Sequence, residues 1–182
     1  KIGLVAFAPH NGCLNLNELQ AAIALVKQVK LKCDVLIVSF HAGAEGSKAT
    51  RVPRRHEIFL GQDRGDVYEA AHAVIDAGAD VVLGHGPHVT RAVEVYKNKF
   101  IAYSLGNFCT YGMFSLSGPN GFAPLLQLKI DREGDFLSAN VISVKQDKVN
   151  RLHLDTTFAA FKRMKYLTDV DFPDINLVFS AN

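Results

Sequence analysis

The segment Gly78-Ala79-Asp80-Val81-Val82-Leu83-Gly84-His85-Gly86-Pro87-His88 joins a short apolar run to a polar loop. Gly78 is suited to end a helix, because glycine readily adopts the left-handed conformation found at helix C-termini. The apolar run after it is short and bounded by turn residues, which is typical of a strand buried on both faces. A helix end, a buried strand and a polar loop in this order indicate one repeat of an α/β layer.

The same pattern recurs towards the N-terminus. The chain offers a strand at Ile2–Ala8, helical spacing of apolar residues from Leu19 to Val29, a strand at Val35–Val38 that runs on to His41, and a helix at Asp66–Ala77. Asn15 or Asn17 is a candidate N-cap for the first helix, because its side-chain oxygen can accept a bond from a free N–H of the first turn. The residues between 42 and 64 are polar and irregular. The order strand, helix, strand, loop, helix, strand predicts a mostly parallel sheet.

Towards the C-terminus the pattern changes to hairpins. The predicted strand pairs are Ala92–Tyr96 with Phe100–Ser104, and Leu125–Ile130 with Phe136–Val144. Each pair is separated by a short polar turn, which favours antiparallel pairing. A last helix is predicted over Thr156–Tyr166, with Asp155 as its cap. We therefore expect residues 1–182 to form a single α/β domain that ends in antiparallel strands.

The composition excludes several classes of protein. The chain has 182 residues, of which 48% are hydrophobic and 21% charged, with a formal net charge of +2. Such a chain has enough apolar surface to fold, too little positive charge to indicate nucleic-acid binding, and no apolar run long enough to span a membrane. The three cysteines, Cys13, Cys33 and Cys109, form no C-x-x-C pair and indicate neither a disulfide framework nor a cysteine zinc site.

Histidines follow two of the predicted strands. His41 comes at the end of the strand that begins at Val35, and His85 comes directly after the strand Val81–Leu83, with His88 three residues further on. The carboxyl ends of parallel strands meet at one edge of a sheet, so these imidazoles should converge. Neutral imidazole is a good ligand for manganese, iron or zinc, which makes His41, His85 and His88 candidate metal ligands. The alternative is that each is a hydrogen-bonded or solvated loop residue.

Two more polar residues fall close to these strand ends. Glu45 lies four residues after His41 and either orients a metal ligand or a water, or is simply a solvated carboxylate. Asn107 follows the turn residue Gly106 at the end of another predicted strand, and its amide bonds either a substrate oxygen or the backbone of the turn. We place Glu45 and Asn107 with the catalytic candidates and Gly106 with the substrate-binding ones.

The loop that follows Glu45 concentrates positive charge. Its arginines are Arg51, Arg54 and Arg55. A guanidinium group suits phosphate and carboxylate oxygens, so these arginines are candidate substrate-binding residues. The alternative is an ordinary solvated loop.

Three motifs resemble one known family. Residues 38–45 (VSFHAGAE), 78–89 (GADVVLGHGPHV) and 101–108 (IAYSLGNF) are similar, in order and spacing, to segments of the bacterial capsule-synthesis or poly-γ-glutamate-synthesis family of CapA type. That family is related to the calcineurin-like metallophosphoesterases. Two features depart from the broader pattern: Ala42 replaces a tryptophan after the first histidine, and two residues rather than one separate His85 and His88.

The resemblance implies a fold and a cofactor. The fold is α/β, part of a calcineurin-like metallophosphoesterase sandwich with mixed sheets and flanking helices. His41, His85 and His88 would ligate divalent metal ions (manganese, iron or zinc), and the related enzymes hold a dinuclear centre. The family's early motifs, an aspartate after the first strand and an Asn-His-rich loop, are absent. We therefore expect this chain to be the later portion of a larger domain, completed by an upstream segment or a partner subunit.

The resemblance also implies a function. We expect a capsule or poly-γ-glutamate biosynthesis protein of the cell envelope or an extracytoplasmic compartment, acting by metal-dependent hydrolysis of a phosphoester. One alternative is a non-catalytic component that binds an anionic polymer during its assembly or export. Another is metal-assisted hydrolysis of amide bonds in poly-γ-glutamate. In each case the partner is an anionic polymer or a phosphoester, and neither nucleic acid nor a membrane span in this chain is expected.

Overall fold

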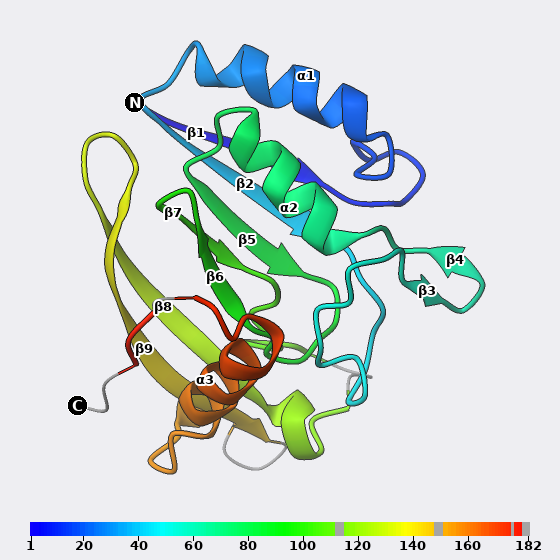
Figure 1. Ribbon diagram of the computed structural model, residues 1–182. Helices are drawn as coiled ribbons and strands as arrows, with labels where there is room; N and C mark the ends of the chain where they lie inside the picture. The colour runs from blue at the N-terminus through cyan, green and yellow to red at the C-terminus, as the bar shows by residue number, and fades with distance from the viewer. Residues whose placement is uncertain (112–114, 148–150, 176, 180–182) are drawn as a thin grey trace.

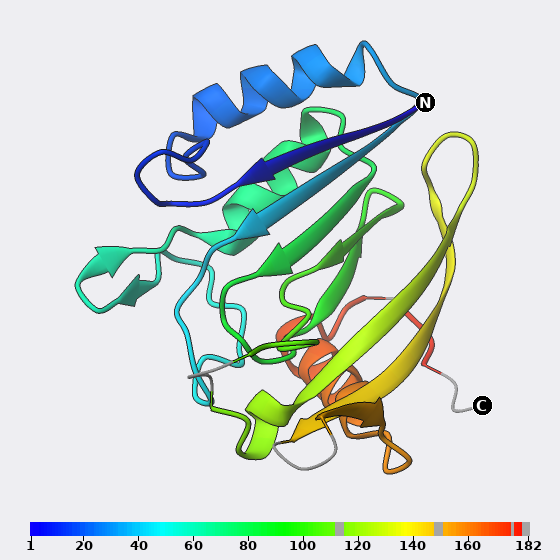
Figure 2. The same ribbon diagram turned by 180° about the vertical axis from the view of Figure 1, so that it is seen from behind.

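The computed structural model describes residues 1–111, 115–147, 151–175 and 177–179. A five-stranded sheet lies at its centre, with strands in the order β1-β2-β5-β7-β6. The helices α1 (Leu19–Lys30) and α2 (Val67–Asp76) cover one face of this sheet, as Figure 1 shows. A second, antiparallel sheet lies against the other face, which Figure 2 shows from behind. The helix α3 (Ala159–Asp171) contacts β6 and the second sheet, and its residues Leu167 and Met164 join the cores on either side of the central sheet. The fold is therefore mixed α/β with flanking helices, as predicted.

The central sheet has the strand pairing that the sequence predicts. Its strands are β1 (Ile2–Phe7), β2 (Val35–His41), β5 (Val81–His85), β6 (Val93–Tyr96) and β7 (Lys99–Ala102). The pairs β1–β2, β2–β5 and β5–β7 are parallel, while β6 and β7 form an antiparallel hairpin. The hairpin turn is Lys97-Asn98, and both residues have a positive φ. Asparagine tolerates that conformation, which explains a tight turn at this point.

Alternating side chains of the central sheet belong to two separate hydrophobic cores, one on each face. Leu36, Val38 and Phe40 of β2 belong to a core shared with α1 and α2. The neighbouring Ile37 points to the other face, where it joins a core made with the second sheet and with Met164 of α3. Because successive side chains of a strand point to opposite faces, a strand with a core on each side reads as a continuous apolar run.

The second sheet has the order β10-β9-β8, with β8 (Phe122–Ile130), β9 (Phe136–Asp147) and β10 (Arg151–Leu154). The β8–β9 hairpin was predicted, although both strands extend further than expected. Strand β10 was not predicted. A short hairpin of β3 (Ile58–Phe59) and β4 (Gln62–Asp63) was also missed, because two-residue strands leave no periodic signal.

Helix ends agree with the sequence only in part. Helix α2 begins one residue after the predicted start, and the Asp66 side chain caps it by accepting bonds from the N–H groups of Tyr68 and Glu69. Helix α3 spans Ala159–Asp171 rather than Thr156–Tyr166, and its N-cap residue is Phe158 and not the predicted Asp155, although the Asp155 side chain accepts a bond from the Ala159 N–H. The predicted asparagine cap of α1 is wrong: the residue before α1 is Glu18, and it makes no side-chain capping bond.

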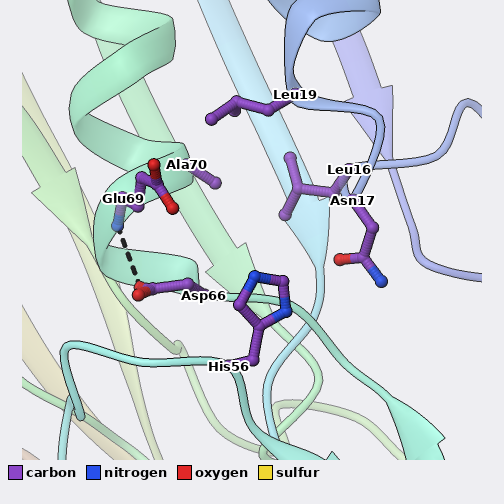
Figure 3. A pocket seen from close by; sticks show the side chains of 7 residues that line it. All are labelled: Leu16, Asn17, Leu19, His56, Asp66, Glu69 and Ala70. Atoms are coloured by element: carbon purple, nitrogen blue, oxygen red, sulfur yellow. Dashed lines mark hydrogen bonds between the residues drawn. The ribbon is translucent and has the colours of Figure 1, made fainter.

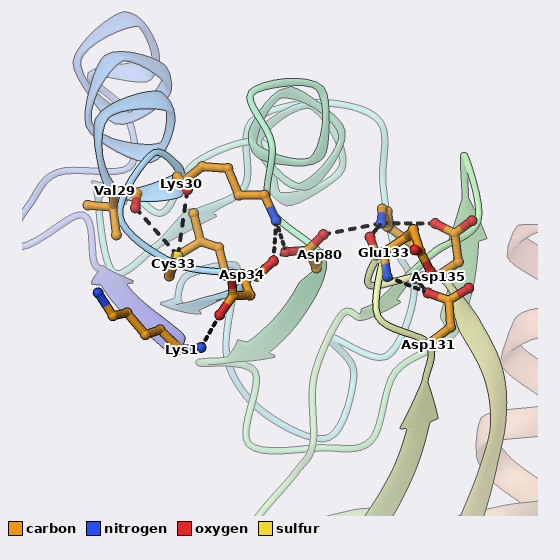
Figure 4. A network of polar contacts seen from close by, with 11 residues as sticks. Lys1, Val29, Lys30, Cys33, Asp34, Asp80, Asp131, Glu133 and Asp135 are labelled. Carbon is orange, nitrogen blue, oxygen red and sulfur yellow. Dashed lines mark hydrogen bonds and ion pairs between the residues drawn. The ribbon is translucent and has the colours of Figure 1, made fainter.

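An ion-pair network lies at the end of the central sheet opposite the predicted site. Asp80 is buried before β5, and its carboxylate pairs with the amino groups of Lys30, at 2.6 Å, and Lys99, at 3.1 Å. Lys99 also pairs with Asp135 in the β8–β9 turn, at 2.9 Å (Figure 4). This network fastens α1 and the second sheet to the central sheet.

Among the described residues, one edge of the central sheet is open. Strand β1 pairs only with β2 among the strands that the structure describes, and Ile2 and Leu4 are 75% and 68% exposed. Among the helices of the described residues, none has the length and apolar character needed to cross a bilayer.

Candidate metal centre

Three side chains meet at the carboxyl end of the central sheet. His41, Glu45 and His88 each offer one ligand atom, and these atoms lie within 4.8 Å of one another. His41 is the last residue of β2, Glu45 lies in the loop after it, and His88 lies in the loop after β5. The rings of His41 and His88 have centroids 5.5 Å apart. The loops after β2 and β5 therefore meet, as the strand-end argument predicts.

Backbone contacts hold these two loops against each other. The Ala42 N–H donates to the His85 carbonyl at 2.9 Å, and the Gly46 N–H donates to the Pro87 carbonyl at 2.9 Å. Gly86 has φ 117°, and a Cβ at this position would lie 2.4 Å from the Ala42 carbonyl oxygen. Only glycine permits so close an approach, and it is this approach that sets Glu45 beside His88.

The Asn107 side chain determines which nitrogen of His88 carries a lone pair. Its Nδ2 donates to the carbonyls of His88, at 3.1 Å, and Asn120, at 3.0 Å. Its Oδ1 must then be the acceptor that faces His88 Nδ1 at 2.9 Å, so Nδ1 bears the hydrogen. In the neutral ring Nε2 is left with the lone pair, and this atom lies 3.7 Å from Glu45 Oε2. Asn107 thus satisfies backbone groups, one of the two roles foreseen, and also orients His88.

The His88 backbone is itself unusual. Its φ is 57°, in the left-handed region that costs a non-glycine residue energy. Such conformations persist where the surroundings enforce them, and they cluster at functional sites. Here the two bonds between Asn107 and His88 supply that enforcement.

Arg64 is the positive group of the site, and it was not predicted. Its Nη2 donates to Glu45 Oε1 at 2.6 Å, which leaves Glu45 Oε2 directed towards His88. Arg64 is nearly buried, and its charge is one of the causes that lower the pKa of His41. No periodic signal marks this arginine, because it lies in an irregular segment before α2.

The pKa values of His41 and His85 lie below the ordinary value and favour neutral imidazoles. Burial lowers the pKa of His41, and the charges of His88 and Arg64 lower it further. Burial also lowers the pKa of His85, with a second contribution from His88. Neutral rings are the form that binds metal.

His85 is the third of the predicted metal ligands. It is the register partner of His41 across the β2–β5 pair, so it lies at the same edge of the sheet. Within the described residues, however, the compact group of ligand atoms consists of His41, Glu45 and His88, and His85 is not a member. The three histidines converge at this edge as expected, and the role of His85 as a metal ligand stays a prediction; the loop after His41 folds back and places the Glu45 carboxylate in the compact group.

His10 is a further imidazole at this edge. Its ring centroid lies 6.1 Å from that of His41. His10 follows β1 as His41 ends β2, so the strand-end rule that selected His41 would have found it too.

The three predicted arginines contact different parts of the molecule. Arg51 pairs with Asp171 at the end of α3, and the Arg54 guanidinium lies 4.7 Å from the centre of the Tyr68 ring. Arg55 borders an open cavity of about 460 Å³ whose wall includes Ala44, the residue before Glu45.

Gly106 has φ 68°, and a Cβ there would lie 3.0 Å from the Phe122 carbonyl oxygen, so its role is to allow the turn.

A second, much smaller cavity lies between α1 and the start of α2. Its volume is about 30 Å³, and Figure 3 shows Asn17, His56 and Asp66 among its lining residues. This is room for about one water molecule and not for a substrate. The larger cavity, which borders Ala44 and Glu57, has room for a ligand.

The geometry can be compared with known proteins. Residues 6–111, more than half of the chain, match the family described as bacterial capsule synthesis protein PGA_cap. The chain belongs to this capsule synthesis family. The matched range includes His41, Glu45, Arg64, His88 and Asn107.

Three of the matched relatives are named for capsule or polymer synthesis. The chain is 35% identical over 109 residues, 58% of its length, to the capsule biosynthesis protein CapA of Bacillus anthracis. It is 35% identical over 86 residues, 47% of its length, to the PGA biosynthesis protein CapA of Bacillus subtilis (strain 168). It is 33% identical over 123 residues, 66% of its length, to a probable polyglutamine synthesis accessory protein of Mycobacterium tuberculosis (strain ATCC 25618 / H37Rv). The matched regions span 23%, 19% and 29% of these relatives, so the chain corresponds to less than a third of each.

Proposed function

We propose that His41, Glu45 and His88 bind a divalent metal ion, and that the whole protein uses it to hydrolyse a phosphoester during capsule or poly-γ-glutamate synthesis. The observation that carries this proposal is the convergence of the three ligand atoms within 4.8 Å. Two imidazole nitrogens and a carboxylate oxygen suit manganese, iron or zinc better than magnesium or calcium. The 3.7 Å between His88 Nε2 and Glu45 Oε2 is too long for a hydrogen bond and suits two ligands of one ion with bonds of about 2.0–2.2 Å.

The residues around the ligands have supporting roles. Asn107 keeps the hydrogen of His88 on Nδ1, so that Nε2 presents its lone pair to the site. Arg64 binds one oxygen of Glu45 and leaves the other directed inward. The chemistry that such an ion supplies is Lewis-acid activation of water and of a phosphoryl oxygen at neutral pH.

The first experiment measures metal. The protein is loaded with Mn²⁺, dialysed and analysed by elemental mass spectrometry, alongside His88→Ala. We expect bound metal in the unchanged protein and a loss of at least about tenfold in affinity in the variant. His72→Ala is the matched control: His72 also bonds a carboxylate, that of Glu94 at 2.9 Å, but it lies away from the site. Equal metal content in all three proteins would contradict the proposal.

The second experiment tests catalysis in the full-length protein. We expect Mn²⁺-dependent hydrolysis of a chromogenic aryl phosphate, abolished by His88→Ala. Release of glutamate from poly-γ-glutamate without phosphatase activity would instead support amide hydrolysis. The same ligand set serves both reactions, because each requires an activated water and a polarised oxygen.

A binding component without catalysis is the second candidate. The cavity of about 460 Å³ is lined by Arg55 and His56, and both are exposed to solvent. These side chains would attract the carboxylates of an anionic polymer. Binding of poly-γ-glutamate that is weakened by Arg55→Ala, in a protein that holds metal but hydrolyses nothing, would favour this candidate.

A further inference from the structure

The loop that carries Glu45 has no regular structure of its own. It runs from Ala42 to Glu57, between β2 and β3. Loops of this length are uncommon in compact domains unless they are functional, and they need specific contacts to hold one conformation. The contacts that hold this loop therefore determine where Glu45 lies.

A buried ion pair supplies those contacts. Arg91 is 0% exposed, and its guanidinium makes two bonds to the Glu57 carboxylate, at 2.8 and 2.7 Å. The same guanidinium donates to the Ala49 carbonyl at 2.8 Å. Glu57 Oε2 also accepts a bond from the Ala44 N–H at 3.1 Å, and Arg91 Nη2 lies 3.5 Å from the Ala44 carbonyl oxygen. Both backbone groups of the residue before Glu45 thus face the ion pair.

Glu57 also connects the pair to Arg64, the other partner of Glu45. The Arg64 N–H donates to the Glu57 carbonyl at 2.8 Å, and the Gly43 N–H donates to the Arg64 carbonyl at 2.8 Å. Glu57 therefore holds two neighbours of the Glu45 carboxylate: the backbone of Ala44, through its own carboxylate, and Arg64, through its own carbonyl.

Stability alone does not account for this arrangement. A buried ion pair loses much of its Coulomb attraction to desolvation, and apolar residues of similar size are often as stabilising or more so. What apolar residues cannot do is bind the N–H and carbonyl groups of an irregular loop. We propose that the Glu57–Arg91 pair is a positioning device that fixes the loop of residues 42–57 and so places Glu45 against His88 and Arg64. Its link to metal binding rests on the proposed function.

The test uses the full chain and a double variant, Glu57→Leu with Arg91→Met, which removes both charges together and so avoids leaving one of them buried alone. Amide hydrogen exchange is followed by NMR in metal-free protein, and Mn²⁺ affinity is measured separately. We expect exchange of the Ala44 amide to become at least about tenfold faster, because its acceptor is lost. We expect Mn²⁺ affinity to fall about 10- to 100-fold, as when other groups that support a metal ligand are removed.

Two controls separate positioning from general loss of structure. The Ala42 amide, which donates to the His85 carbonyl at 2.9 Å, should keep its protection in the double variant. Asp80→Asn disrupts a different buried pair at the opposite end of the sheet and should leave both the Ala44 exchange rate and the metal affinity unchanged. Unchanged Ala44 exchange in the double variant would overturn the proposal. If the unchanged protein binds no Mn²⁺, the proposed metal function fails, while the exchange measurement still decides whether the pair positions the loop.

Discussion

Replacing Asn107 by alanine should weaken both the fold and the metal site. Asn107 is 2% exposed and makes three hydrogen bonds, to His88 Nδ1, the His88 carbonyl and the Asn120 carbonyl. At about 1 kcal/mol for each buried bond, Asn107→Ala should lower the free energy of unfolding by roughly 3 kcal/mol. Loss of the acceptor at His88 Nδ1 also releases the ring, so Mn²⁺ affinity should fall about 10- to 100-fold.

A second substitution separates the two effects. Asn107→Asp keeps an oxygen acceptor for His88 Nδ1 but removes both donors to the carbonyls. It should therefore lose stability while keeping most of the metal affinity. Urea unfolding gives the stability, titration calorimetry gives the affinity, and ¹⁵N NMR shifts of the imidazole give the position of the ring hydrogen. Asn140→Ala is the control: it removes an exposed hydrogen bond from the Asn140 side-chain amide to Gln127 and should change the free energy of unfolding by less than about 0.5 kcal/mol. If His88 keeps its hydrogen on Nδ1 and its metal affinity in Asn107→Ala, the reasoning is refuted.

Three further predictions follow from single positions. His85→Ala should bind Mn²⁺ at least about tenfold more tightly than His88→Ala does, because His85 lies outside the compact ligand group. Equal losses of metal in the two variants by elemental analysis would contradict this. Burial alone raises the pKa of Asp155, but bonds from Thr157 and from the first turn of α3 lower it more, so the pKa lies below its ordinary value. The ionised Asp155 carboxylate should contribute about 1 kcal/mol to the free energy of unfolding above pH 4, and this contribution should be lost as the pH falls through the lower folded-state pKa. Thermal melts of Asp155→Ala should lack that part of the acid dependence. Leu60 is 88% exposed with φ 50°, and Leu60→Asn should raise the free energy of unfolding by about 1 kcal/mol in urea, because asparagine adopts this conformation more readily.

The strands and helices with strong local patterns were predictable. Val35–His41 and Val81–His85 stand out because both faces of each strand are buried, and the cap at Asp66 is a contact between residues two and three positions apart. The pairs β3–β4 and β9–β10 were not predictable, because very short strands and strands with exposed faces carry little apolar periodicity.

For the candidate site, the sequence determined that histidines follow two strands of a mostly parallel sheet, since buried strands and the polar residues at their ends are local patterns. Only the tertiary structure decided that Glu45 and not His85 completes the compact group, that Arg64 binds Glu45, and that Asn107 orients His88. The His88–Asn107 contact joins residues 19 positions apart, and the Arg64–Glu45 contact joins residues 19 positions apart across an irregular loop. The path of that loop is set by the buried Glu57–Arg91 pair, whose partners are 34 residues apart, and no local pattern in the chain records such a pairing.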